Sequence, residues 1–477
     1  MFPLAKLARQ LRCAALRKHK VMIEAAGRLP EAQTSGLRQN ALPFVETLAQ
    51  SVANIAPTAT PSLTIPLVFA SAGNGTWLAF LLATVGLVLV SCCINQFARR
   101  SATPGSLYHY VSTGLGERTG LITGWALFLA YVTTGVVTVY GFAIFSGDLL
   151  LTLTGVPLPV WLWYILCVGM AWCCAYKDIQ LSARLMLTIE AASVGAILIL
   201  GIIVWAARGF ALDTAQITLA GVAPENVRLG MVLAVLAFVG FESATALGGE
   251  AQNPLQNIPR SVLWSTVMVG TLFVIMSYIE VVGFATSPSP LEKSTTPLPD
   301  LAALYHVPAF GPLLALAAAL TFFSCCLACI NAVARILFMM GRDGRLPASI
   351  GQAHATNETP HIAVTLTALV IFVLTAGSTL AGLGLIEGIT YYGSIATYGF
   401  LLVYILIAIV APLYLRREGA LNPTQVVVTI LAIVFMMLPV IGSFYPVPPY
   451  PLNILPYIFL VYMALGVLWA FSCRNNQ

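Results

Sequence analysis

The feature that most restricts the fold of this chain is a series of long apolar runs separated by short polar breaks. An α-helix needs about 20 apolar residues to cross roughly 30 Å of hydrocarbon, and twelve runs of about that length are present. They are residues 48–72, 77–97, 119–146, 159–176, 185–207, 228–250, 261–285, 310–337, 361–380, 385–410, 424–443 and 453–472. The sequence therefore predicts an all-α integral membrane protein with twelve transmembrane helices.

Composition and basic residues support this prediction and give it an orientation. The chain is 59% hydrophobic and 9% charged, whereas soluble domains carry about 25% charged residues. Cytoplasmic loops retain Lys and Arg, and all but Arg208, Arg228 and Lys293 of the 23 such residues fall in the two tails or in loops on one side. Arg335 is assigned to one of these loops. We expect a multi-pass protein of the cell (cytoplasmic) membrane, in contact with membrane lipid, with cytoplasmic N- and C-termini.

The two tails and the cysteines carry less information about function. Residues 1–47 form a basic tail that is expected to be disordered, residues 473–477 form a short second tail, and translation could instead start at Met22. The basic residues are dispersed, so they predict topology and no nucleic-acid partner. Three cysteines have the spacing of a metal cluster but lack nearby His or acidic partners, so we expect helix packing and no metal site. They are Cys325, Cys326 and Cys329.

Two of the runs contain residues that interrupt helices. In the first run, Pro57 and Pro61 each remove a backbone N–H and conflict with the carbonyl four residues earlier, so we expect Asn54 to Thr60 to be unwound. In the sixth run the weak point is Ala237 to Glu242, where Gly240 separates two apolar residues from Phe and Glu. A proline kink and a packing glycine are the simpler explanations. Paired discontinuous helices, however, point to a transport site at the bilayer midplane.

Three stretches at the predicted cytoplasmic ends of the runs resemble those of a known family. They are "GFESATALGGEAQNPLQNIPRSV", "TPGSLYHYVSTGLGERTGLITGW" and "NAVARILFMMGRDGRLP". The first resembles the sixth-span signature of the amino acid-polyamine-organocation (APC) superfamily of permeases: Gly-Phe-Glu, small residues, Glu-x-x-Asn-Pro, then Ile-Pro-Arg. The second and third resemble the family's segments leading into the third span and following the eighth. The resemblance covers about residues 40–475.

The resemblance implies the leucine-transporter-like fold, in which two inverted five-helix repeats enclose a central site. The repeats would be residues 48–207 and 228–410, making a transporter core of 48–410, with two accessory helices in 424–472. It implies a secondary active transporter, not an enzyme, that moves small-molecule amino acids or organic amines by alternating access. Transport would be proton or sodium symport, or exchange. No cofactor is implied beyond a co-transported proton or sodium ion, and the oligomeric state is left open.

The resemblance also predicts which residues of this chain would bind the substrate. In the family, the substrate carboxylate meets exposed N–H groups of the first span and its ammonium meets free carbonyls of the sixth, as expected for helix ends. Pro57 departs from the family's Gly-x-Gly stretch and removes one donor, which makes an amine or other organic cation more credible, although the hydroxyls of Thr58 and Thr60 could replace it. Phe241 would be an aromatic gate. The matching residues are Ile55, Ala56, Pro57, Thr58, Ala59, Thr60, Phe238, Val239, Gly240 and Phe241.

The candidate coupling residues are acids and hydroxyls inside the runs. Where several relatives place a Lys in the fifth span, this chain has Ser193, which leaves room for a sodium ion together with Ser324. Glu190, about one turn away, could instead carry a proton. Glu242 is either a proton acceptor coupled to opening or a hydrogen-bonded strut between helices. Glu280, in the seventh run, is expected to make a polar contact inside the bundle.

A channel and a membrane-embedded enzyme are the alternative functions. An enzyme would need His, Asp or Cys clustered at a membrane face, whereas the five histidines are scattered along the chain. A channel would need a repeated filter or a charged ring, and neither is visible in the sequence. Saturable counterflow would distinguish a transporter from a channel, which gives conductance instead.

Overall fold

The computed structural model describes residues 36–445 and 447–472, and its regular elements within these ranges are helices. The long helices are α4 (Thr76–Ala98), α6 (Glu117–Thr154), α7 (Val160–Lys177), α8 (Ile179–Ala207), α11 (Pro254–Phe284), α13 (Gly311–Arg342), α14 (His361–Leu380), α15 (Leu385–Arg417), α16 (Pro423–Gly442) and α17 (Leu455–Ser472). The shorter elements are α2 (Phe44–Ile55), η1 (Thr60–Thr64), α3 (Ile65–Ala72), η2 (Gly73–Gly75), α5 (Ser106–Leu115), α9 (Thr214–Ile217), α10 (Pro224–Leu236), η3 (Ser243–Leu247), η4 (Leu291–Lys293), α12 (Pro297–Leu304), η5 (Pro308–Phe310) and η6 (Leu452–Ile454).

Ten segments of the described chain are long and apolar enough to cross a membrane, so the prediction of a multi-pass, all-helical membrane protein is confirmed. One of the ten, Phe44–Ala98, contains α2, α3 and α4. The sixth predicted run is not among them, because α10 has only 13 residues. The bounds predicted for 361–380 coincide with those of α14.

Some helix ends differ from the predicted ones. The loop expected between the fourth and fifth runs shrinks to Asp178, because α7 extends to Lys177 and α8 begins at Ile179. The Asp178 carboxylate accepts a hydrogen bond from the Gln180 backbone N–H at 2.8 Å, which caps α8 early. The third run also continues as helix to Thr154, eight residues beyond the predicted end at 146.

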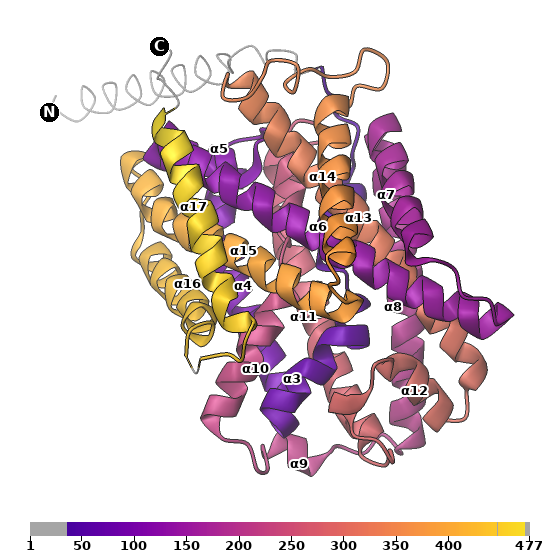
Figure 1. Ribbon diagram of the computed structural model, residues 1–477. Helices are drawn as coiled ribbons and strands as arrows, with labels where there is room; N and C mark the ends of the chain where they lie inside the picture. Colours follow the sequence, from indigo (N-terminus) through magenta and orange to yellow (C-terminus); the bar gives the residue numbers. More distant parts are fainter. Residues whose placement is uncertain (1–35, 446, 473–477) are drawn as a thin grey trace, which may run out of the picture.

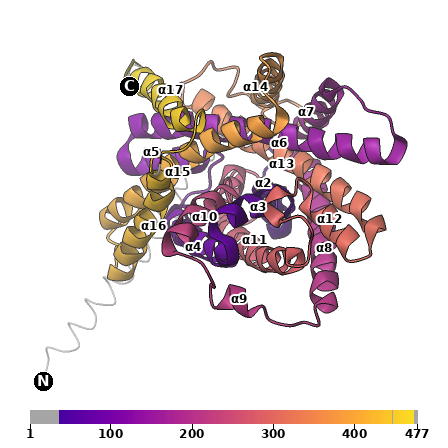
Figure 2. The same cartoon turned by 60° about the horizontal axis from the view of Figure 1, so that its bottom comes forward.

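The interrupted helices lie at the centre of the bundle. In Figure 2, α2 and α3 lie at the centre beside α10; α6, α13 and α15 cover one side and α8 another, α4 and α11 lie on the lower side, and α16 and α17 lie to the left. α5 lies at one end of the molecule, and α9 and α12 lie at the other (Figure 1). We refer to these as the α5 end and the α12 end. The segments that contain the two breaks are therefore enclosed by protein, as irregular backbone within a membrane must be.

Arg335 corrects one sequence assignment, because it is not a loop residue. It lies inside α13 with 0% of its side chain exposed, and it forms a bidentate pair with Glu250, which is also 0% exposed. Its Nε and Nη2 atoms donate to the two carboxylate oxygens at 2.5 and 2.7 Å. A guanidinium within a bundle requires such a partner, since an unpaired buried charge is costly.

Residues 37–42, which we call the strap, extend across the α5 end of the bundle. The backbone N–H groups of Ala41 and Leu42 donate to the Glu250 carbonyl at 2.8 and 3.1 Å, and Gln252 N–H donates back to the Leu42 carbonyl at 2.8 Å. Arg38 pairs with Asp178 at 2.9 Å. The disordered tail predicted for 1–47 falls partly outside the described residues, but Arg38, Ala41 and Leu42 are held by these bonds and α2 begins at Phe44.

Candidate substrate site

The first helix breaks where Pro57 interrupts its hydrogen-bond ladder. α2 ends at Ile55, and Ala56 adopts a left-handed conformation with φ of 54°. Pro57 has no N–H to continue the ladder, so the chain turns and resumes as a π-helical segment at Thr60 before α3. The predicted break of 54–60 is therefore too long at both ends, because Asn54 and Ile55 remain helical and Thr60 already begins η1.

The second break lies where the sequence predicts it. α10 ends at Leu236, Ala237 to Glu242 form turns, and the chain continues as the 3-10 segment η3. Gly240 has a φ of 85°, a conformation that residues with a Cβ rarely adopt. The glycine thus permits the change of direction that separates α10 from η3.

The two breaks are in direct contact. A Cβ on Gly240 would lie 1.4 Å from Nδ2 of Asn54, so the absence of a side chain permits the close approach. On the side of the α5 end, Ser243 Oγ donates to the Gln50 carbonyl at 3.1 Å, and the Ala244 N–H donates to Ser51 Oγ at 3.0 Å. Residues that are about 190 positions apart in the chain therefore form one interrupted centre.

Two of the clustered cysteines donate hydrogen bonds to Asn54, beside the first break. Cys325 Sγ donates to the Asn54 backbone carbonyl and Cys329 Sγ donates to Asn54 Oδ1, both at 3.2 Å. Both thiols come from consecutive turns of α13. Among the described residues no group of His, Cys, Asp and Glu is arranged to hold a metal ion. The sequence prediction of helix packing did not include this hydrogen bonding to the break.

Glu242 connects the second break to two neighbouring helices. Tyr131 of α6 donates to its Oε1 and Tyr404 of α15 donates to its Oε2, both at 2.6 Å. The Tyr404 hydroxyl also accepts the Gly240 N–H at 3.2 Å. Sequence reasoning missed both tyrosines, since nothing in an apolar run marks which hydroxyl faces an acid in another helix.

We predict that Tyr404→Phe lowers the free energy of unfolding more than Tyr131→Phe does. Hydrogen bonds to charged groups contribute about 1.5–3 kcal/mol, and Tyr404→Phe additionally leaves the buried Gly240 N–H without its acceptor. Denaturant titration of the two variants in detergent measures the difference. Equal losses in both variants would show that the bond to Gly240 contributes nothing.

The candidate coupling residues lie between α8 and α13, at two different heights along these helices. Glu190 is 3% exposed, and its Oε2 accepts a bond from Thr321 at 3.3 Å, while its Oε1 has no partner within the described chain. Ser324 Oγ, one turn along α13, lies beside this carboxylate but forms no bond of good geometry to it. Ser193 donates instead to the Ala317 carbonyl at 3.2 Å, two turns of α13 before Ser324.

The three sequence stretches that carry the family resemblance meet at the α5 end. A Cβ on Gly248 would lie 2.5 Å from the Thr103 carbonyl oxygen, so the loop after α4 packs directly on the segment after η3. The Tyr108 hydroxyl of α5 donates to Asp343, just after α13, at 2.7 Å. Burial, together with this carboxylate, raises the pKa of Tyr108. Residues of all three stretches are therefore in contact.

A family profile described as amino acid permease matches residues 47–471. The chain belongs to the amino acid permease family. It is 25% identical over 318 residues to the methylthioribose transporter of Bacillus subtilis, covering 63% of this chain and 66% of that protein. It is 23% identical to the vacuolar cationic amino acid transporter 4 of Arabidopsis thaliana (60% and 50% covered) and 22% identical to the low-affinity putrescine importer PlaP of Escherichia coli (59% and 63%). The matched part spans from half to about two thirds of these relatives.

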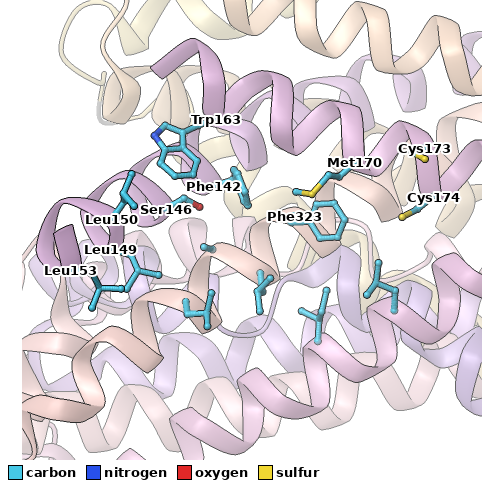
Figure 3. A pocket seen from close by; sticks show the side chains of 15 residues that line it. Phe142, Ser146, Leu149, Leu150, Leu153, Trp163, Met170, Cys173, Cys174 and Phe323 are labelled. Atoms are coloured by element: carbon cyan, nitrogen blue, oxygen red, sulfur yellow. The ribbon is translucent and has the colours of Figure 1, made fainter. Parts of the chain in front are cut away.

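In this member of the amino acid permease family, a cavity of about 730 Å³ lies away from the two breaks. It is bounded by α6, α7, α8 and α13, and Figure 3 shows that Phe142, Trp163, Met170 and Phe323 project into it. Its lining is almost wholly apolar and includes no residue of the predicted substrate site. Polar groups gather at the interrupted centre and not along this cavity.

Proposed function

We propose that the protein is a secondary active transporter that moves amino acids or related organic amines across the cytoplasmic membrane by alternating access. The observation that carries this proposal is the contact between the two helix breaks, with Gly240 against Asn54. Helix ends expose backbone donors and acceptors together with the helix dipole, so they can hold a charged substrate without water. Membership of the amino acid permease family supports the same function.

The proposal includes the number of spans, their grouping into repeats and their orientation in the membrane. Counting α2, η1 and α3 as one discontinuous span, and α10 and η3 as another, gives twelve spans with α16 and α17 as accessory helices. We assign the first ten spans to two inverted five-helix repeats, and both termini to the cytoplasmic side at the α5 end. The positions of the breaks, in the first and sixth spans, support this assignment.

Polar atoms at the breaks support the substrate residues proposed from the sequence. The hydroxyl of Thr58 is buried and has no hydrogen-bond partner within the described ranges, so it can replace the donor that Pro57 lacks. At the second break, no hydrogen bond to the Val239 carbonyl is found in the described part of the chain. This carbonyl could accept a bond from a substrate ammonium. Phe241 is 0% exposed and packs against Tyr404, consistent with an aromatic wall.

The geometry favours Glu190 over Glu242 as the coupling acid. Both oxygens of Glu242 accept bonds from tyrosines, so we assign it as a strut. One oxygen of Glu190 accepts no bond of good geometry, and the Ser324 hydroxyl lies close enough to interact with the carboxylate, so a proton can bind there and leave. A sodium ion is the alternative coupling ion, and because Ser193 contacts α13 about two turns from Ser324, the ion would be held beside one of these two hydroxyls.

We predict that Glu190→Gln removes the stimulation of uptake by a pH gradient while leaving substrate exchange intact, because the amide cannot carry a proton. Uptake into liposomes under an imposed pH gradient, and counterflow without one, measure the two activities separately. Sodium-driven uptake that survives Glu190→Gln and is lost in Ser193→Lys would overturn the assignment in favour of sodium.

The transport function itself is tested by counterflow in the same liposomes. A panel of labelled amino acids and amines is offered to vesicles that are preloaded with each unlabelled compound. Saturable accumulation that requires the internal substrate is expected of a transporter. Conductance without counterflow would instead identify a channel, and chemical conversion of the substrate would identify an enzyme.

A further inference from the structure

Glu280 of α11 has a fully enclosed carboxylate with no partner. It is 0% exposed, and neither oxygen has a hydrogen-bond partner within the described ranges. None of the ion pairs of the described chain includes it. The polar contact expected from the sequence is therefore not formed. A buried carboxylate is costly unless a cation or several donors offset its charge, so this residue lacks the group that would stabilise its charged form.

The position of Glu280 on α11 places it toward the interrupted centre. Gly270 faces α4, and Gly283 faces α8 and α12, which fixes two directions around the helix. Glu280 lies between them, on the same face as Phe273, whose ring packs on Phe238 of the second break at 5.0 Å. α11 also contacts η1, just beyond the first break. Seven residues of helix rise by about 10 Å, so Glu280 lies about that distance beyond Phe273, toward the α12 end.

The same face offers surroundings that suit an organic cation. Phe273 lies two turns before Glu280 and Phe284 lies one turn after it, and both are buried. Aromatic rings attract alkylammonium groups through their negative faces. A metal cation would instead seek several oxygen ligands, and among the described residues no group of three or more His, Cys, Asp and Glu side chains is arranged to hold one.

We propose that Glu280 binds the second ammonium group of a substrate that carries two, such as a basic amino acid or a diamine, while the first is held at the helix breaks. This inference rests on the proposed transport function and names its substrate class. The substrate supplies the charge that Glu280 lacks, and a chain of methylene groups spans the apolar interval between the breaks and Glu280.

The test compares two ligands that differ only by the second amine. Lysine and norleucine compete for the uptake of a labelled substrate in liposomes that contain the full chain. We expect lysine to compete at least about tenfold more strongly than norleucine in the wild type, and this ratio to fall to about one in Glu280→Gln, because a buried charge pair loses its partner. Glu280→Asp, which keeps the carboxylate, should retain a preference for lysine. Glu292→Gln, an exposed change at the α12 end, is the matched control.

The outcomes separate this inference from the transport function. A lysine-to-norleucine ratio that is unchanged in Glu280→Gln, with both ligands weakened equally, would show a structural role and overturn the inference. Wild-type transport of neutral amino acids without any preference for lysine would also overturn it, while leaving the transport function standing. Absence of counterflow for every compound in the panel would remove the transport function, and the inference with it.

Discussion

Replacing Arg335 by methionine is expected to lower the free energy of unfolding by about 3–5 kcal/mol, because the change leaves Glu250 as a buried carboxylate without its partner. Both side chains are 0% exposed, so water cannot take over the lost bonds. The Glu250 backbone also accepts two bonds from the strap, and a displaced Glu250 would therefore loosen the strap as well. Denaturant titration in detergent measures the change.

Two controls show whether charge, rather than packing, causes this loss. The double variant Arg335→Met with Glu250→Leu removes both charges, and it should recover most of the stability. Arg38→Met breaks an ion pair whose side chains are 42% and 33% exposed, and it should cost no more than about 1 kcal/mol. A double variant as unstable as the single one would show that the pair is not the cause.

Replacing Gly240 by alanine is expected to abolish counterflow. The new Cβ would stand in a left-handed conformation and lie 1.4 Å from Asn54 Nδ2 and 2.7 Å from Asn54 Cγ, so the Asn54 side chain would have to leave its place against the second break. The conformation alone costs about 1–2 kcal/mol, and displacement of Asn54 adds to it. The variant is first shown to be monodisperse after purification, and counterflow is then measured in liposomes that contain it.

The matched control for this substitution is Gly377→Ala in α14. A Cβ there meets no atom within 4 Å, and helix propensity favours alanine by about 1 kcal/mol. That variant should keep full counterflow. Activity retained in Gly240→Ala would mean that the approach of the two breaks is not required for transport.

Features that depend on local sequence could be predicted well. The break at Ala237 to Glu242 follows from one glycine, and the bounds of α14 follow from an uninterrupted apolar run. The first break also follows from Pro57, although a proline affects the residues before it less than we expected. Each of these features is a property of neighbouring residues.

Features that depend on contacts between distant residues could not be predicted. Arg335 and Glu250 are 85 positions apart, and their pairing requires knowing that η3 ends beside α13. One signal was present, because an arginine in an otherwise apolar run needs a buried carboxylate. The tyrosines that hold Glu242 gave no such signal, since a tyrosine is as compatible with a lipid-facing position as with a buried one.

The hydrogen bonds that hold Asn54 determine how easily the first break can be released from α13. Both donors are thiols, which are weaker hydrogen-bond donors than hydroxyls. The two bonds to Asn54 are therefore specific in geometry but weak, whereas one turn earlier in α2 the Gln50 Nε2 atom donates a stronger bond to the Ala328 carbonyl of α13 at 2.8 Å. We therefore expect the weak thiol bonds of Cys325 and Cys329 to lower the free energy needed to release Asn54, and serine hydroxyls at the same two positions to raise it.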